Sequence, residues 1–125
     1  MDKILVVDDN GTNRKLLRVI LKSIGYDTIE AEDGQQGVEL ARDFMPALII
    51  MDIQMPVLSG NEALKILKAD PATAEIPVIA LTSYAMSGDK EKFLEEGFDS
   101  YIAKPVEQKK LLAAIEALLK GKAYD

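Results

Sequence analysis

The chain of 125 residues contains no cysteine and no histidine. Without cysteine it can form no disulfide, no catalytic thiol and no thiolate metal site. Without histidine it has no serine–histidine or cysteine–histidine nucleophile, no imidazole base and no ordinary zinc site. Any chemistry must therefore be carried out by carboxylates, hydroxyls and lysines, together with a hard cation where one binds.

Basic segments and long hydrophobic segments are also missing. The 15 Lys and Arg residues against 21 Asp and Glu residues give a net charge of −6, which repels nucleic acids and anionic membranes. The longest uncharged apolar stretch, residues 45–51, is far shorter than the ~20 residues that span a bilayer, and the N-terminus lacks a signal peptide. We expect a cytoplasmic protein that binds neither nucleic acid nor membrane.

Short aliphatic runs of strand length recur along the chain. Residues 4–7, 47–51 and 78–81 are continuously apolar, which is typical of parallel strands that are covered on both faces. Residues 26–31 and 98–102 are more polar, so we expect them at the edges of the same sheet.

Amphipathic helical patterns separate these strands. One apolar stripe consists of Leu16, Leu17, Ile20, Leu21 and Ile24. The other patterns lie at residues 35–44, 60–69, 87–96 and 111–119, and glycines at 25 and 97 are expected to end two of the helices in a left-handed conformation.

Five strands and five helices in strict alternation predict an α/β fold with right-handed crossovers. Two polar edge strands around three apolar ones favour the strand order 2-1-3-4-5, which is the flavodoxin-like doubly wound arrangement. We expect one domain over residues 1–125, with a loose tail at residues 121–125.

Polar side chains follow four of the expected strands at their carboxyl ends: Asp8 and Asp9, Asp52, Thr82, and Lys104. Each has a simpler explanation when taken alone. The acidic pair could cap a helix, Asp52 could start a turn, Thr82 could be a strand-end hydroxyl and Lys104 a solvated charge.

The combination favours a phosphoryl-transfer site. Three carboxylates at adjacent strand ends repel one another unless one is protonated or a cation intervenes. An oxygen-only cluster suits Mg²⁺, with Mn²⁺ as an alternative, because such a site accepts waters and phosphate oxygens. A carboxylate nucleophile, a cation, a lysine and a hydroxyl are together typical of phosphoryl transfer.

The chain resembles a response-regulator receiver domain of the CheY kind over nearly its full length. The matching features are residues 6–10 (VVDDN), 51–60 (MDIQMPVLSG), 81–83 (LTS), Tyr101, and Lys104 with Pro105. The resemblance implies that Asp52 is the phosphoacceptor and that Asp9 and Asp52 bind Mg²⁺ directly. It also implies that Asp8 acts mostly through water and that Gln54 offers its backbone carbonyl.

The same resemblance assigns the remaining residues of the site. Thr82 and Lys104 would hold the phosphoryl oxygens, and the Lys104–Pro105 bond is expected to be cis. Tyr101 resembles the aromatic residue of a switch that responds to Thr82; otherwise it is only a half-buried edge-strand tyrosine. Gln54 and Tyr84 occupy the positions at which family side chains tune the lifetime of the phosphoryl group.

Residues 82–90 are similar to single-domain regulators of the DivK kind and to receivers of hybrid histidine kinases, which commonly act in phosphorelays. The resemblance implies a two-component signalling switch rather than an enzyme with an external substrate. A histidine kinase or a histidine phosphotransfer protein would supply the phosphoryl group. A downstream protein would bind the face formed by the fourth helix, fifth strand and fifth helix, around Lys90, Tyr101 and Lys109, with no DNA-binding output domain. We expect a monomer, with dimerisation on phosphorylation as an alternative.

Three other interpretations remain open. A haloacid-dehalogenase-like phosphatase also uses an aspartate nucleophile, but its nucleophile follows the first strand and a second acid stands two residues later, where this chain has Gln54 after Asp52. A flavodoxin-like FMN carrier shares the fold, but the first strand–helix loop is too acidic to bind a flavin phosphate. Finally, the chain could be a receiver domain excised from a larger kinase or transcription factor, although we favour a stand-alone protein.

Overall fold

Five parallel strands form one sheet at the centre of the molecule. The structure is a computed structural model that describes residues 3–55, 57–83 and 89–123. The strands are β1 (Lys3–Val7), β2 (Asp27–Ala31), β3 (Leu48–Asp52), β4 (Val78–Thr82) and β5 (Ser100–Ala103). They pair in the order β2-β1-β3-β4-β5, and every pair is parallel. The predicted fold class and strand order are confirmed.

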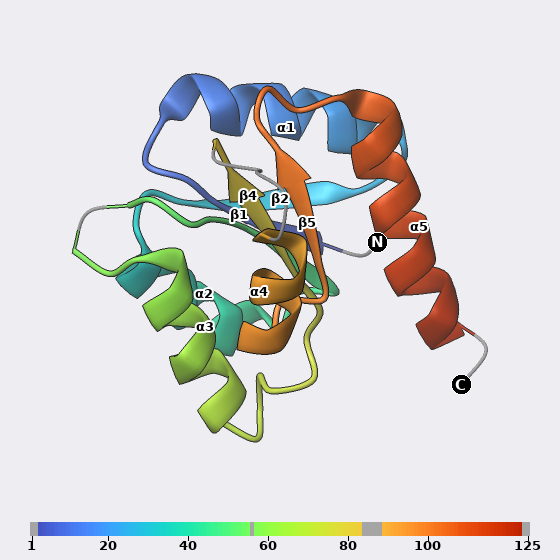
Figure 1. Cartoon of the computed structure of the whole chain (residues 1–125). Coiled ribbons are helices and arrows are strands. Elements are labelled where there is room, and N and C mark those ends of the chain that lie inside the picture. Colours follow the sequence, from blue (N-terminus) through green and yellow to red (C-terminus); the bar gives the residue numbers. More distant parts are fainter. Residues whose placement is uncertain (1–2, 56, 84–88, 124–125) are drawn as a thin grey trace.

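Helices cover both faces of this sheet (Figure 1). They are α1 (Gly11–Ser23), α2 (Gly34–Phe44), α3 (Gly60–Ala69), α4 (Asp89–Glu96) and α5 (Gln108–Ala123). The buried side chains of α1 and α5 pack on one face of the sheet, and those of α2, α3 and α4 pack on the other. The molecule therefore has three layers, with a separate apolar core on each side of the sheet.

The central strands are apolar because both of their faces are covered. All five residues of β3 and of β4 are buried, as are four of the five in β1, whereas only one residue of β2 and one of β5 are buried. The prediction of polar edge strands is confirmed. Alternate residues along each central strand point into opposite cores, so a continuous apolar run supplies apolar side chains to the cores on both faces of the sheet.

The apolar stripe predicted for α1 is buried only in part. Leu17, Ile20 and Leu21 are buried, as expected. Leu16 and Ile24, which also belong to the predicted apolar stripe, are 47% and 38% exposed, so the stripe is only partly buried. α1 contacts β1 and the edge strand β2, and of the predicted stripe Leu17, Ile20 and Leu21 are the residues buried there.

Glycine and polar caps set several helix ends. Gly25 and Gly97 follow α1 and α4 with φ of 93° and 112°, which confirms the predicted left-handed ends. Ser59 caps α3 in a capping box with Glu62. At the other end of the chain, α5 continues to Ala123, so residues 121–123 of the expected loose tail are helical, and residues 124–125 lie outside the described part. None of the helices in the described part of the chain is long and apolar enough to cross a membrane.

Candidate functional site

Three carboxylates meet at the carboxyl edge of the sheet. Val7 pairs with Met51 in the β1–β3 register, so the next residues along the two strands, Asp8 and Asp52, lie side by side. Asp8, Asp9 and Asp52 each offer a carboxylate oxygen, and these oxygens lie within 4.8 Å of one another. Asp8 and Asp52 are buried, whereas Asp9 is exposed, so one side of the cluster is open to solvent.

Backbone amides orient the two buried carboxylates. The amide of Asn10 donates to Asp8 Oδ1 at 2.9 Å, and the amide of Gln54 donates to Asp52 Oδ1 at 3.0 Å. Both contacts link residues two apart, which is a local turn that aspartate commonly makes. The turn-forming role of Asp52 therefore coexists with its place in the cluster, and Asp52 Oδ2 is directed to the lysine described next.

Lys104 supplies the positive charge of the site. Its Nζ lies 2.9 Å from Asp52 Oδ2 and 3.5 Å from Asp8 Oδ2, and its side chain is 20% exposed. The amide of Lys104 donates to the carbonyl of Thr82 at 2.8 Å, which fixes the loop after β5 against the end of β4. The Lys104–Pro105 peptide is cis, as predicted.

Burial and charge shift the pKa values at this edge. Burial raises the pKa of the Asp8 carboxyl, and the neighbouring Asp52 charge raises it further, against the lowering effects of the Asn10 amide and Lys104. Burial alone would lower the pKa of Lys104, but its hydrogen bond to Asp52 and the charges of Asp52 and Asp8 raise it overall. The cluster thus carries an excess of negative charge that one ammonium group does not neutralise.

Gly60 leaves room for the backbone around Asp52. A Cβ built at Gly60 would lie 2.4 Å from the carbonyl oxygen of Asp52 and 2.9 Å from the Cα of Ile53. The amide of Gly60 donates to the carbonyl of Ile53 at 3.0 Å. The start of α3 therefore packs directly behind the end of β3, and this close approach requires glycine.

Thr82 and Tyr101 lie on neighbouring strands and on one face of the sheet. Ala80 pairs with Tyr101 and Thr82 pairs with Ala103, so the two residues are one repeat apart along the same face. Thr82 is buried at the end of β4, and Tyr101 is half-buried, with its ring centroid 6.0 Å from that of Phe93 in α4. The register brings the two predicted switch residues to the same region.

Asn13 and Arg14 also contact the acidic cluster, and the sequence analysis missed both. Asn13 Nδ2 donates to Asp8 Oδ2 at 3.4 Å, and Arg14 Nη1 donates to the carbonyl of Asp8 at 2.7 Å. Asn10, and not Asp8 or Asp9, caps the N-terminus of α1, because its side chain accepts from the amides of Thr12 and Asn13. The side chains of the acidic pair therefore do not cap this helix. The position of Asn13 and Arg14 in the first turn of α1, next to the loop after β1, was the one sequence signal, and it does not indicate which atoms they contact.

The donor set fits a divalent cation of the hard type. The ligand atoms in reach of one another are carboxylate oxygens, which Mg²⁺ prefers, and one side of the cluster is open for waters or a substrate oxygen. Asp8 and Asp52, both buried, and the exposed Asp9 are the residues that could hold it. The backbone carbonyl of Gln54 is the further ligand that was predicted. Gln54 is exposed, and its backbone amide donates to Asp52 Oδ1.

Comparison with known proteins decides the family. The family model described as the response regulator receiver domain matches residues 4–116. The chain belongs to this family. The receiver domain is 41% identical to the polar-differentiation response regulator DivK of Brucella anthropi over 116 residues, which cover 93% of this chain and 94% of that protein.

Solved structures of receiver domains superpose closely on this one. The receiver domain of the sensor histidine kinase PA1611 from Pseudomonas aeruginosa, solved with a magnesium ion coordinated in its active site cleft, is 34% identical, with a TM-score of 0.87 over 95% of this chain and 98% of that chain. Chemotaxis protein CheY4 of Vibrio cholerae is 27% identical, with a TM-score of 0.86 over 94% of this chain and 98% of that chain. The predicted resemblance is confirmed, and the phosphatase and flavin-carrier alternatives are set aside.

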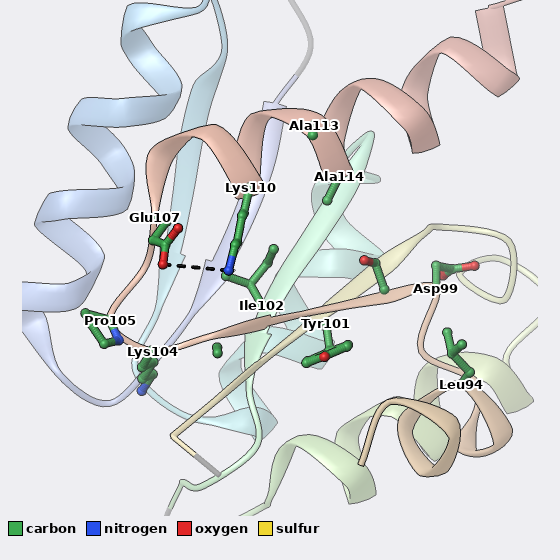
Figure 2. Close-up of a pocket in the computed structure, with 12 residues that line it drawn as sticks. Leu94, Asp99, Tyr101, Ile102, Lys104, Pro105, Glu107, Lys110, Ala113 and Ala114 are labelled. Carbon is green, nitrogen blue, oxygen red and sulfur yellow. Dashed lines mark ion pairs between the residues drawn. The ribbon is translucent and has the colours of Figure 1, made fainter. Parts of the chain in front are cut away.

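A groove runs beside β5 of the receiver domain, away from the acidic cluster. The cavity measures about 650 Å³. Figure 2 shows Tyr101 and Ile102 of β5 at its floor, Leu94 of α4 on one side and Ala113 and Ala114 of α5 on the other. Lys104 lines one end, so the groove reaches the residue that contacts Asp52. Among the other predicted residues, Tyr84 lies outside the described part of the chain, and the Lys90 side chain is likewise not described.

Proposed function

We propose that this receiver domain is a phosphorylation-activated switch of a two-component system or phosphorelay, with Asp52 as the phosphoacceptor. The observation that carries the proposal is the environment of Asp52. It is a buried carboxylate with one oxygen fixed by the Gln54 amide and the other 2.9 Å from Lys104 Nζ, beside a second buried carboxylate. Receiver domains interact with histidine kinases or histidine phosphotransfer proteins, and either class would donate the phosphoryl group.

The chemistry is one phosphoryl transfer. A carboxylate oxygen of Asp52 forms a bond to phosphorus, the phosphorus–nitrogen bond of a donor phosphohistidine breaks, and the imidazole leaves with the bonding electron pair. Lys104 Nζ then binds an oxygen of the transferred group, because its present partner, Asp52 Oδ2, has become part of the acyl phosphate, which is a mixed anhydride. Thr82, buried one position beyond the register partner of Asp52, donates its hydroxyl to another oxygen.

Receiver domains bind Mg²⁺ at an acidic pocket, and the donor set of this chain fits that ion. Asp9 and Asp52 would hold it directly, Asp8 through water, and Gln54 by its backbone carbonyl. When bound, the cation neutralises charge on the transferring phosphoryl oxygens. Mn²⁺ takes similar oxygen ligands and would substitute for it.

The output is a protein–protein contact at the groove between α4, β5 and α5. Phosphorylation adds charge and acceptor oxygens beside Thr82 and Lys104. Thr82 moves toward the phosphoryl group, and the Tyr101 ring occupies the space it leaves, which changes the floor of the groove in Figure 2. No external substrate is turned over, and no nucleic acid or membrane takes part.

Intact-mass measurement tests this proposal. The full chain is incubated with Mg²⁺ and acetyl phosphate, and the wild type should gain the mass of one phosphoryl group, with no gain when EDTA removes the cation. Asp52→Asn, which keeps the shape of the side chain but removes the nucleophilic oxygen, should gain none. Asp43→Asn, which changes an exposed aspartate on α2, is the matched control and should behave as the wild type. A phosphorylated Asp52→Asn protein at the wild-type rate would contradict the assignment.

A further inference from the structure

Arg14 contacts three residues, on two segments of the chain, with the three nitrogens of its guanidinium group. Nη1 donates to the backbone carbonyl of Asp8 at 2.7 Å, and Nε donates to Glu30 Oε1 at 3.2 Å. Nη2 lies 3.8 Å from Glu32 Oε1. The side chain is only 15% exposed, so Arg14 is built into the structure, although it lies at the edge of the acidic cluster.

The Arg14 side chain folds back over the start of α1 toward the loop that carries the acidic pair. A Cβ built at Gly11, the first residue of α1, would lie 3.4 Å from Arg14 Nη2, so the guanidinium occupies the space beside that glycine. The bond to Asp8 spans six residues and joins the first turn of α1 to the end of β1. Glu30, which lies in β2, anchors the guanidinium from the other side.

The peptide that Arg14 contacts also carries the exposed carboxylate of Asp9. Within the described part of the chain, the Asp9 side chain has no hydrogen-bond or ion-pair partner, so the backbone that carries it is its one described restraint. The peptide unit that joins Asp8 to Asp9 presents its carbonyl oxygen to Arg14. Because a peptide unit is planar, fixing its carbonyl also fixes the amide of Asp9 and limits the directions open to the Asp9 carboxylate.

We propose that Arg14 is a positioning residue for the cation site, which orders the Asp8–Asp9 peptide so that the Asp9 carboxylate faces Asp52. The inference rests on the proposed Mg²⁺ site at the acidic cluster and adds a residue that acts on it through the backbone. Outer contacts of this kind commonly change metal affinity by roughly 10- to 100-fold when they are lost.

A purely electrostatic role for Arg14 predicts the opposite result. Removing its positive charge leaves Glu32 without its ion-pair partner and Glu30 with Arg18 alone, and the added negative potential attracts a cation more strongly. Loss of positioning weakens Mg²⁺ binding, whereas loss of charge alone strengthens it. The sign of the change therefore distinguishes the two roles.

Arg18 provides a matched control on the same helix. Arg18 Nη1 lies 2.7 Å from Glu30 Oε2, so Arg18→Met removes one positive charge from the same carboxylate that Arg14 binds. Arg18 is 46% exposed, and its only described partner is Glu30, so this variant leaves the Asp8 carbonyl contact intact. Any change common to both variants reports on Glu30 and on charge. The difference reports on the Asp8 carbonyl and on the longer contact with the exposed Glu32.

The experiment is a Mg²⁺ titration of the whole 125-residue chain, without phosphodonor, by calorimetry or by NMR of backbone amides. We expect the Kd of Arg14→Met to rise roughly tenfold and that of Arg18→Met to stay the same or fall. Arg14→Lys, which keeps the charge but has one ammonium in place of a planar group with three nitrogens, should also weaken binding. It serves as the deciding variant if Arg14→Met does not fold.

An Arg14 variant that binds Mg²⁺ as tightly as the wild type, or more tightly, overturns the inference. An equal loss of affinity in the Arg14 and Arg18 variants also overturns it, because the effect then comes from Glu30. If the wild-type protein itself shows no Mg²⁺ binding, the proposed cation site fails, and the inference about Arg14 fails with it.

Discussion

Replacing Lys104 by methionine removes the ammonium group that lies between two buried carboxylates. Lys104 Nζ is 2.9 Å from Asp52 Oδ2 and 3.5 Å from Asp8 Oδ2, and methionine keeps most of the aliphatic stem. Removing one partner of a buried ion pair typically costs about 3–5 kcal/mol of unfolding free energy, because the other charge is left uncompensated. We therefore expect Lys104→Met to destabilise the protein strongly in the absence of a cation.

Protonation of one carboxyl limits this cost. Keeping an aspartate protonated at pH 7 costs about 4 kcal/mol, which is the distance from its usual pKa near 3.9 at about 1.4 kcal/mol per pH unit. The side chain of Lys104 is also 20% exposed, so water screens part of its interaction. The expected loss at pH 7 is about 2–4 kcal/mol relative to the wild type.

The pH dependence of this loss has a definite sign. In the variant, one of the paired carboxyls has a raised pKa, so the native state binds more protons than the unfolded state and stability increases as the pH falls. The deficit should shrink by at most about 1.4 kcal/mol per pH unit between pH 7 and pH 5. In the wild type, the raised pKa of Lys104 means that its ion pairs contribute fully at these pH values and are lost only at alkaline pH, above the usual range of lysine.

Urea unfolding at several pH values, with and without Mg²⁺, measures these effects. Mg²⁺ at a hundred times the wild-type Kd stabilises the folded wild type by about 2.7 kcal/mol. At the same Mg²⁺ concentration the variant should gain more, because no ammonium group competes with the cation for the carboxylates. Lys110→Met, on the exposed face of α5 with Glu107 as its ion-pair partner, is the control and should change stability by at most about 1 kcal/mol. A deficit no larger than that of the control, or one that grows on acidification, would refute the reasoning.

Three further substitutions test other parts of the site. Asp9→Asn should weaken Mg²⁺ binding in a calorimetric titration and slow phosphorylation, while it stabilises the cation-free protein by at most about 1 kcal/mol through reduced carboxylate repulsion; unchanged affinity would exclude Asp9 as a ligand. Gly60→Ala should destabilise the protein by about 1–3 kcal/mol in urea unfolding, because its Cβ would lie 2.4 Å from the Asp52 carbonyl oxygen; wild-type stability would show that the two segments separate easily. Thr82→Ala should leave Asp52 able to be phosphorylated but keep the Tyr101 ring signals unchanged on addition of beryllofluoride, whereas the wild type shifts; equal NMR shifts in both proteins would disprove the coupling.

Most of the fold could be predicted because the three central strands are buried on both faces. A run such as residues 47–51 leaves few alternatives to a central parallel strand, and the two more polar runs identify the sheet edges. Strand order then determines which loops meet at the carboxyl edge, so Asp8, Asp52 and Lys104 could be placed together from the sequence. The structure brings these residues within ion-pair distance.

The sequence did not predict which residues of a helix are buried, nor the contacts between side chains and backbone atoms at the site. Leu16 and Ile24 fit the helical period but are exposed, since the width of a buried stripe depends on what covers the helix and not on its period alone. Arg14 was missed because arginine on a helix is usually a solvated charge. Its contact with the Asp8 carbonyl involves a backbone atom, and backbone acceptors leave no mark in the residue pattern.

The central claim is that Asp52 receives the phosphoryl group, and locating the modification tests it most directly. The protein is phosphorylated in the presence of Mg²⁺ by a phosphodonor, the acyl phosphate is reduced with borohydride, and the peptides are sequenced by tandem mass spectrometry. Reduction converts a phosphorylated aspartate to homoserine, so the residue itself is marked. We predict homoserine at position 52 and unmodified aspartate at positions 8 and 9. Homoserine at either position of the acidic pair, with Asp52 unchanged, would contradict the account.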